Sequence, residues 1–365
     1  MRKTGDASVA PTQKPSSPLT EKKQWLLMII FLLIAVTSVM AVVTQSQDFS
    51  IAEFSAYVQG ASIPWLIAAL AGMILFVLFE GLALLVVCRA LGCRQSLWHG
   101  WVYSASDIYF SAITPSATGG QPASAYFMIK DGISGMMSTA ALTANLLMYT
   151  LSIVIIGIVC FVFRFDIFLA YGATSKILIV IGLCVQCGLA FFFFMLLKRE
   201  KLLSRICHFV LRLLCKLRLL KNCEQKQEKL DTYMQNYREH SRYIAGHGKA
   251  MGLCLLLNLL QRAMQIAITS FVYAATAGAT ASTALDLWFT QGFVNLGATF
   301  VPIPGAMGIS DYLMLDGFDN LMSSGQAVNL ELLSRSFSFY GCVLLCGVTV
   351  LTQYFVVKKR GKMKC

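Results

Sequence analysis

Long uninterrupted apolar segments dominate this chain, and polar residues are gathered between them. A helix needs about 20 predominantly apolar residues to span a bilayer. Six segments are long enough, at residues 25–44, 64–88, 138–163, 176–197, 250–277 and 333–357. Their apolar residues are continuous and do not alternate with polar ones as in the strands of a membrane β-barrel. The sequence therefore predicts an all-α integral membrane protein with six full transmembrane helices.

Two further apolar segments, residues 101–129 and 285–318, are interrupted near their middle. The interruptions consist of residues that end helices or open unusual backbone angles together with polar neighbours: Thr114, Pro115, Gly119, Gly120, Gln121 and Pro122 in the first segment, and Pro302, Pro304, Gly305 and Gly308 in the second. Neither arm of either segment is long enough to cross a bilayer. Paired interrupted segments in corresponding places of two halves indicate a substrate site in transporter-like proteins.

Composition excludes most other classes. Hydrophobic residues make up 57% of the chain and charged residues 13%, whereas about 25% of the residues of a soluble domain are charged. Cys184 and Cys187 form a C-x-x-C pair inside a predicted transmembrane helix, and we interpret them as packing residues. The four histidines have no metal-ligand spacing. We therefore assign no metal and no cofactor.

Basic residues are concentrated at three places in the chain, which carries a net charge of +12. They lie in residues 1–24, in residues 198–249 and in residues 358–365. By the positive-inside rule all three segments are cytoplasmic, so both termini are cytoplasmic and residues 45–63 lie outside. The basic excess thus indicates orientation and contact with an anionic membrane surface, and we expect no nucleic-acid partner.

This orientation fixes how the interrupted segments insert. Residues 101–129 must enter and leave on the cytoplasmic side, and residues 285–318 must enter and leave from outside. We therefore predict two oppositely oriented re-entrant hairpins, one in a first membrane half at residues 25–197 and one in a second half at residues 250–357. The two halves form a candidate inverted repeat whose hairpin tips meet near the midplane.

The segments outside the two membrane halves are predicted to be polar and cytoplasmic. Residues 1–24 form a disordered tail, and residues 358–365 form a basic tail. Within residues 198–249, residues 201–221 have one apolar and one basic face, which predicts a helix that lies on the cytoplasmic leaflet or packs on the bundle.

Charged side chains at membrane depth are costly and mark functional sites. Arg262 lies near the middle of its span between Gln261 and Gln265, and Arg335 lies in the last span. A guanidinium group suits phosphate because its donors form a rigid fork. Two arginines beside two interrupted segments could hold one anionic headgroup, with amides of helices that begin after Pro122 and Pro304 as further donors.

Three acidic residues lie at similar depth: Glu80, Asp107 and Asp311. They are candidate charge partners, and they supply the alternative interpretation of Arg262. In that interpretation Arg262 forms an internal ion pair with Glu80 or Asp311, and this pair only fixes the packing of the helices.

Two motifs resemble those of a known family. Residues 113–126, followed by Lys130-Asp131-Gly132-Ile133, resemble the signature of the lysylphosphatidylglycerol synthase transmembrane-region family, the flippase-like membrane domain of multiple peptide resistance factors. Residues 302–311 resemble its second motif, Pro-x-Pro-Gly-Gly-x-Gly-x-x-Glu, with Ala306 in place of the second glycine and Asp311 in place of the glutamate. Arg335 matches an arginine at the start of the final helix. The resemblance covers about residues 25–357.

The resemblance implies a standalone relative in the plasma membrane of a Gram-positive-type bacterium. Its expected activity is to flip or bind phosphatidylglycerol or lysylphosphatidylglycerol, which contributes to resistance against cationic antimicrobial peptides. The alternative is the family's enzymatic label, phosphatidylglycerol lysyltransferase, which moves lysine from lysyl-tRNA to the lipid. About eight residues follow the last predicted span, so we expect that a separate synthase chain would have to supply catalysis. A scaffold role is a third interpretation, and the sequence indicates no oligomeric state.

Overall fold

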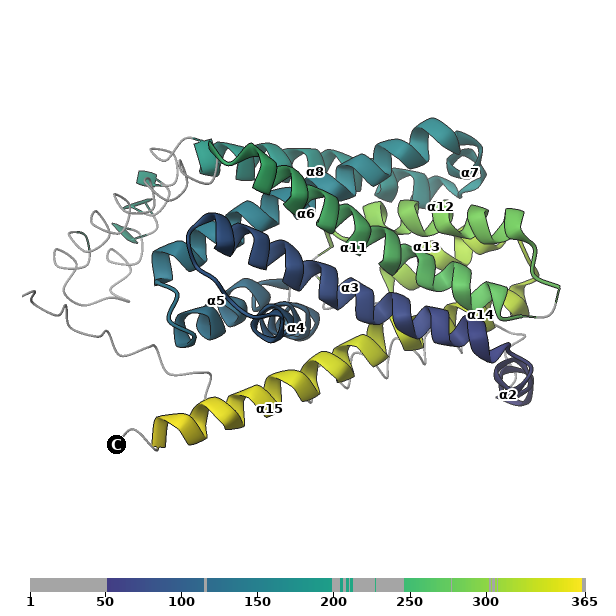
Figure 1. The fold of residues 1–365 in the computed structure, drawn as a ribbon. Helices are drawn as coiled ribbons and strands as arrows, with labels where there is room; N and C mark the ends of the chain where they lie inside the picture. Colours follow the sequence, from purple (N-terminus) through teal and green to yellow (C-terminus); the bar gives the residue numbers. More distant parts are fainter. Residues whose placement is uncertain are drawn as a thin grey trace, which may run out of the picture.

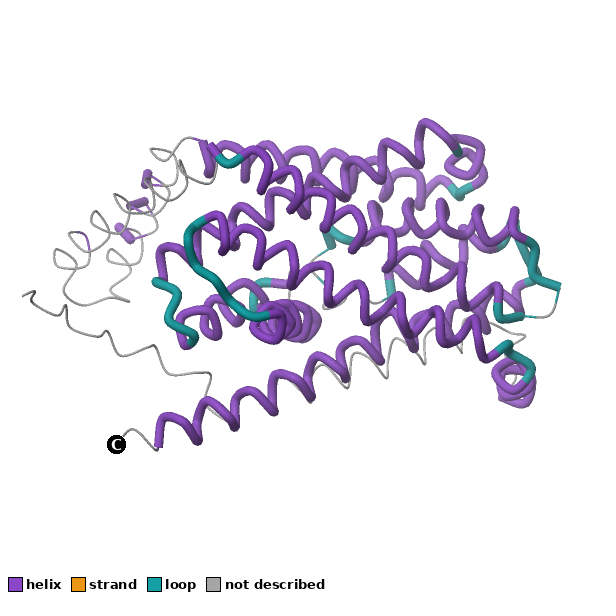
Figure 2. The backbone as a smooth tube through the Cα atoms, in the orientation of Figure 1, coloured by secondary structure: helices purple, strands orange, loops and turns teal. Residues whose placement is uncertain are grey.

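The structure is a computed structural model that describes residues 51–114, 117–198, 246–276, 278–301 and 308–362, with residues 303 and 306 and a few between 204 and 227. Throughout this part of the chain the secondary structure is helical, without strands (Figure 2). The long helices run roughly along one common direction (Figure 1). The observed fold of the described residues is therefore an all-helical bundle.

Five helical segments are long and apolar enough to cross a membrane. They are α3 (Ile63–Ala90), α6 (Gly135–Phe163), α8 (Ala173–Lys198), α11 (Gly248–Ala274) and the continuous run Ser324–Val357. Each matches a predicted span within a few residues, except at the start of the last. The remaining predicted span, residues 25–44, lies outside the described residues, as do the tail at 1–24 and most of the basic segment at 198–249.

The last long helical run begins earlier than the sequence predicted. It consists of α14 (Ser324–Arg335), a π-helical turn η3 (Ser336–Gly341) and α15 (Cys342–Lys362), whereas the prediction began at residue 333. The first turns contain polar residues, and hydropathy alone excluded them. One of these is Glu331, which is 1% exposed and lies near Arg335 on the same helix. The helix continues because this polar side chain is enclosed by protein.

The two interrupted segments are each a pair of short helices, as the glycines and prolines predicted. In the first, α4 (Leu97–Ile113) packs against α5 (Gly120–Lys130), and in the second α12 (Ala281–Ala298) packs against α13 (Ile309–Phe318). Pro115, Pro302, Pro304 and Gly305 lie outside the described residues. The depth of these pairs in a membrane and their inverted relation stay predictions.

The expected helix start after Pro122 was wrong: helix α5 begins at Gly120, so Pro122 stands in its first turn, where a missing amide hydrogen costs little. Helix α13 does begin after Pro304, at Ile309, and the residue before it, Gly308, has φ +83°, a backbone conformation suited to glycine. The amide of Gly308 donates to Asp311 Oδ2 at 2.8 Å. This helix start is therefore capped by the protein's own carboxylate.

Close backbone contacts hold the helices that carry the polar side chains. Helix α3 packs along α11 and also against α4. A Cβ atom at Gly81 of α3 would lie 2.6 Å from the carbonyl oxygen of Gly100 in α4, so the two backbones touch at this point. Small residues allow such close approach between membrane helices. The contact brings α4 against the turn of α3 that carries Glu80, and α11 packs along the same helix.

Two short helices complete the described chain. They are α2 (Ile51–Gln59), within residues 45–63 that the charge pattern predicted to lie outside, and α7 (Phe165–Ala170), between α6 and α8. Arg164, at the end of α6, forms an ion pair with Asp286 of α12. This contact ties the second interrupted segment to the first half of the chain.

Candidate functional site

A cavity of about 150 Å³ lies between α11, α12, α13 and the π-helical turn η3. Polar side chains from all four of these elements line it. They are Arg262, Gln265, Thr269, Gln291, Asn295, Ser310 and Ser338, with Thr299 after α12 and Arg335 at the end of α14. Ala306, inside the second interruption, also lines the cavity. The second interrupted segment therefore forms one wall of a partly polar space, opposite α11 and η3.

Arg262 of α11 lines the cavity, and its guanidinium group lies over two aromatic rings. Its Cζ is 4.0 Å from the ring centroid of Tyr149 and 5.8 Å from that of Phe76, and its Nη1 donates to Gln265 Oε1. Among the described residues no carboxylate lies within ion-pair distance of Arg262, and its buried Nε has no hydrogen-bond partner there. Cation–π contacts stabilise the charge without using its in-plane N–H donors. One donor of Arg262 is thus left for a ligand.

Arg335 faces the same cavity and holds the second interrupted segment. Its Nε is 2.8 Å from Asp311 Oδ1, and its Nη1 donates to Ser310 Oγ at 2.8 Å. Glu331 Oε1 lies farther away, at 3.8 Å from Nε. The buried Nη2 has no hydrogen-bond partner within the described part of the chain. Arg335 therefore holds α13 through the ion pair with Asp311 and the hydrogen bond to Ser310, and its Nη2 has neither kind of partner among the described residues.

The unused donors share one property: each is buried, and each belongs to a residue that lines the cavity. They are Arg262 Nε on α11, Arg335 Nη2 on α14 and Gln291 Nε2 on α12. A buried donor without an acceptor costs about 1–3 kcal/mol, and more when it is charged. An anion in the cavity would supply acceptors for such donors. The arrangement suits a group with several oxygens, such as a phosphate.

The internal ion pair expected for Arg262 does not form. Glu80 instead accepts a hydrogen bond from Gln261 Nε2 at 2.9 Å, and Asp311 pairs with Arg335. Consecutive residues on a helix point about 100° apart, so Gln261 and Arg262 face different neighbours. Arg262 turns toward the cavity, and Gln261 turns toward α3.

The first interrupted segment builds a different polar cluster. Asp107 of α4 accepts from Gln121 Nε2 at 2.6 Å and from Ser111 Oγ at 3.2 Å. A Cβ atom at Gly120 would lie only 2.0 Å from Asp107 Oδ1, so glycine is required for α5 to begin against this carboxylate. The Gly119 amide donates to Thr114 Oγ1 at 2.9 Å. These bonds fix the turn between α4 and α5.

The predicted site residues thus separate into two groups. The structure brings Arg262, Gln265 and Arg335 to the cavity, with Asp311 behind Arg335 and Gly308 as the cap of α13. The second group does not line the cavity. It consists of Glu80 and Gln261, which are hydrogen-bonded to each other, and of the residues at the first interruption: Asp107, Thr114, Gly119, Gly120, Gln121 and Pro122. Sequence reasoning missed Gln291 and Asn295, although polar residues four apart in an apolar helix share one face.

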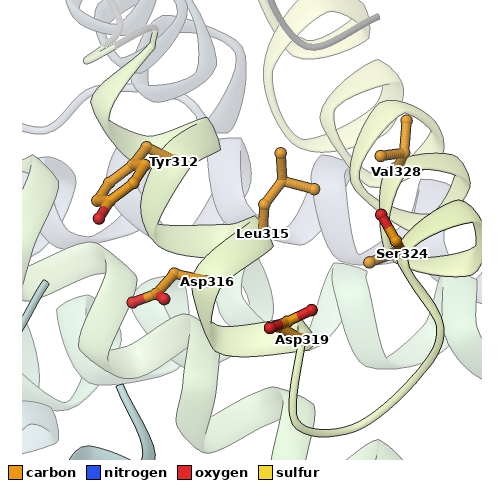
Figure 3. A pocket seen from close by; sticks show the side chains of 7 residues that line it. Tyr312, Leu315, Asp316, Asp319, Ser324 and Val328 are labelled. Atoms are coloured by element: carbon orange, nitrogen blue, oxygen red, sulfur yellow. The ribbon is translucent and has the colours of Figure 1, made fainter. Parts of the chain in front are cut away.

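A second cavity, of about 240 Å³, lies between α13 and α14 (Figure 3). Its lining includes Tyr312, Asp316, Asp319 and Ser324. Asp316 Oδ2 accepts from the Gly172 amide at 3.0 Å. The carboxylates of Asp316 and Asp319 would repel a phosphate, so this larger cavity is not the candidate anion site. Within the described residues, no group of three or more potential metal ligands is found.

The comparison with protein families matches a range of the chain that includes the cavity and the cluster at the first interruption. A family model described as the lysylphosphatidylglycerol synthase TM region matches residues 27–346. The comparison with curated proteins found no match. The matched range includes both interrupted segments, the cavity and Arg335, and with the five apolar spans it identifies a multi-pass membrane protein.

Proposed function

Because the chain belongs to the lysylphosphatidylglycerol synthase transmembrane-region family, we propose that it binds the headgroup of an anionic or aminoacylated phospholipid and moves it between leaflets. The lipid is of the phosphatidylglycerol or lysylphosphatidylglycerol type. We place the protein in a bacterial plasma membrane with both termini cytoplasmic, as its charge distribution indicates.

The observation that carries this proposal is the pair of arginines at one cavity. Arg262 reaches it from α11 and Arg335 from the last helical run, and each keeps a buried donor without a partner among the described residues. A purely structural arginine in a membrane helix uses its donors on carboxylates or carbonyls. Spare donors on two separate elements favour a ligand with more than one acceptor oxygen.

The volume of the cavity limits what it can hold. Sites for whole small molecules measure about 300–1,000 Å³, and this cavity measures about 150 Å³. A phosphate with part of its glycerol fits the smaller space, and the acyl chains of the lipid then stay outside it. We infer that the headgroup enters between helices while the chains remain in the bilayer.

Lipid bound to the purified chain tests the proposal directly. Native mass spectrometry of wild-type protein should show phosphatidylglycerol-type lipid, and Arg262→Gln and Arg335→Gln should each reduce its occupancy. Arg89→Gln removes a charge from an exposed arginine of α3 and should leave occupancy unchanged. Reconstituted vesicles with labelled phosphatidylglycerol should then show loss of transport in the same two variants.

Two results would contradict the proposal. One is wild-type protein that binds no lipid of this type, and the other is full transport in a well-folded Arg262→Gln variant. Formation of lysylated lipid from lysyl-tRNA and phosphatidylglycerol by the purified chain would instead favour the transferase alternative.

A further inference from the structure

The charged groups that line the cavity are all positive. Arg262 and Arg335 line it, and none of the other described lining residues is charged. The chain from 299 to 308, which contains the second interruption, has no charged residue either. Among the described residues no carboxylate lies within ion-pair distance of Arg262. The cavity therefore attracts a negatively charged group and repels a positively charged one.

Two carboxylates lie close to Arg335, but neither of them lines the cavity. Asp311 uses Oδ1 on Arg335 Nε at 2.8 Å and Oδ2 on the amide of Gly308 at 2.8 Å. Glu331 is buried, and its Oε1 lies 3.8 Å from the same Nε. These acids compensate the charge of Arg335 from outside the cavity, so they present no carboxylate to a ligand inside it.

The uncharged polar groups of the cavity also favour a ligand that accepts hydrogen bonds. Gln265 Oε1, Asn295 Oδ1 and Ser310 Oγ each already receive a hydrogen bond from another side chain. The buried lining atoms that lack a partner among the described residues are the three N–H donors given above. Phosphate oxygens are acceptors, whereas an ammonium group is a donor only. A phosphate thus finds donors here, and an ammonium group finds acceptors that are already in use.

We propose that this cavity takes a phosphate headgroup that carries no amine, and that aminoacylation of the lipid prevents its binding. The inference rests on the proposed function, because it names which of the two lipid types the site takes. A phosphatidylglycerol headgroup has one negative charge on its phosphate and uncharged hydroxyl groups on its glycerol. A lysyl ester on that glycerol adds two basic amino groups, so the headgroup changes from anionic to cationic.

The small size of the site keeps those amino groups close to the arginines. Phosphate, glycerol and lysyl ester are joined through a few bonds, and the cavity measures about 150 Å³. Salt screens charges that are partly buried much less than charges in water. Like charges placed together are a common means of rejecting a wrong ligand. A protein with this preference moves the unmodified lipid and leaves the aminoacylated lipid in its leaflet.

Calorimetry with short-chain lipids and the full chain in detergent tests the preference. The ligands are dihexanoylphosphatidylglycerol, dihexanoylphosphatidylethanolamine and the lysyl ester of the first, which carry no, one and two amino groups. We expect affinity to fall in that order, with the lysyl ester bound at least about tenfold more weakly than dihexanoylphosphatidylglycerol. Inorganic phosphate is the fourth ligand, and it should bind more weakly than dihexanoylphosphatidylglycerol because it lacks the glycerol and the acyl chains.

A carboxylate placed in the cavity should reduce the preference. Asn295→Asp has almost the same shape, lies on a lining residue of α12 and keeps the acceptor for Thr299. It should weaken binding of dihexanoylphosphatidylglycerol and strengthen binding of the lysyl ester. Gln59→Glu adds the same charge at an exposed position of α2 and should leave the ratio of the two affinities unchanged. Melting temperatures show whether the variants fold, and Gln265→Glu replaces Asn295→Asp if the latter does not.

The outcomes separate this inference from the proposed function. A lysyl ester that binds as tightly as dihexanoylphosphatidylglycerol, or more tightly, overturns the preference and leaves headgroup binding intact. A folded cavity variant with the wild-type ratio of affinities overturns the assignment to this cavity. Failure of all three lipids to bind refutes the proposed function, and the preference is refuted with it. Inorganic phosphate that binds as tightly as dihexanoylphosphatidylglycerol indicates a site for the free anion, which also refutes lipid recognition.

Discussion

Arg335 and Asp311 join the last helical run to the broken segment that precedes it, with Nε and Oδ1 2.8 Å apart and both side chains buried. The same carboxylate caps α13 through the amide of Gly308. One aspartate thus fixes both the start of α13 and the direction of an arginine that faces the cavity. The geometry of the candidate site depends on this pair as well as on the residues that would touch a ligand.

Removing Asp311 should therefore destabilise the protein. Loss of one partner from a buried ion pair typically costs about 3–5 kcal/mol, because the remaining charge is left uncompensated. We expect Asp311→Asn to lower the melting temperature in detergent, and Asp311→Asn combined with Arg335→Gln to recover part of the loss. Asp311→Glu keeps the charge, so its melting temperature should fall less than that of Asp311→Asn. Equal melting temperatures for all of these variants and the wild type would show that the ion pair contributes nothing to the stability of the protein.

Gly120 should tolerate no side chain. A Cβ atom there would approach Asp107 Oδ1 to 2.0 Å and Ser111 Oγ to 2.1 Å, so Gly120→Val should separate α5 from α4 and abolish lipid transport. Gly188→Ala is the matched control, since nothing lies within 4 Å of a Cβ atom at that helical position of α8. Thermal melting and vesicle transport of both variants check the prediction. Wild-type behaviour of Gly120→Val would mean that α5 does not begin against Asp107.

Topology can be tested with single cysteines in a chain whose native cysteines have been replaced. Cysteines at Ala117 and Gly119 should react poorly with impermeant reagents from either face, because the turn between α4 and α5 is predicted to lie inside the membrane. A cysteine at Ser323, before α14, should react from outside, and so should one at Gln47, which lies outside the described residues. Strong external labelling at Gly119 would exclude the first re-entrant hairpin.

The sequence predicted the position of the helices well and the partners of their polar residues poorly. Glycine and proline locate both interruptions because they act through the local backbone, and continuous apolar runs locate five spans. Which polar side chains contact each other depends on how each helix is rotated about its axis. The positions of residues in the sequence do not give that rotation. Glu80 contacts Gln261 and not Arg262 for this reason. The early start of α14 was missed because Glu331 is buried against protein, and hydropathy treats every glutamate as exposed.

Substitutions of Arg262 distinguish most clearly between a role in lipid binding and a role in helix packing. Its charge rests on the face of Tyr149, and no carboxylate among the described residues pairs with it. Arg262→Gln should therefore lower lipid transport strongly while it changes the melting temperature less than Arg335→Gln does.

Arg262→Lys keeps the charge but loses the planar fork that binds two phosphate oxygens at once, so its transport should fall between those of wild type and Arg262→Gln. Transport rates in vesicles and melting temperatures in detergent, measured on the three variants together, check this ordering. If Arg262→Gln instead melts as low as Arg335→Gln and Arg262→Lys transports as well as wild type, then Arg262 serves packing through its ring contacts, and the headgroup must be held elsewhere in the cavity.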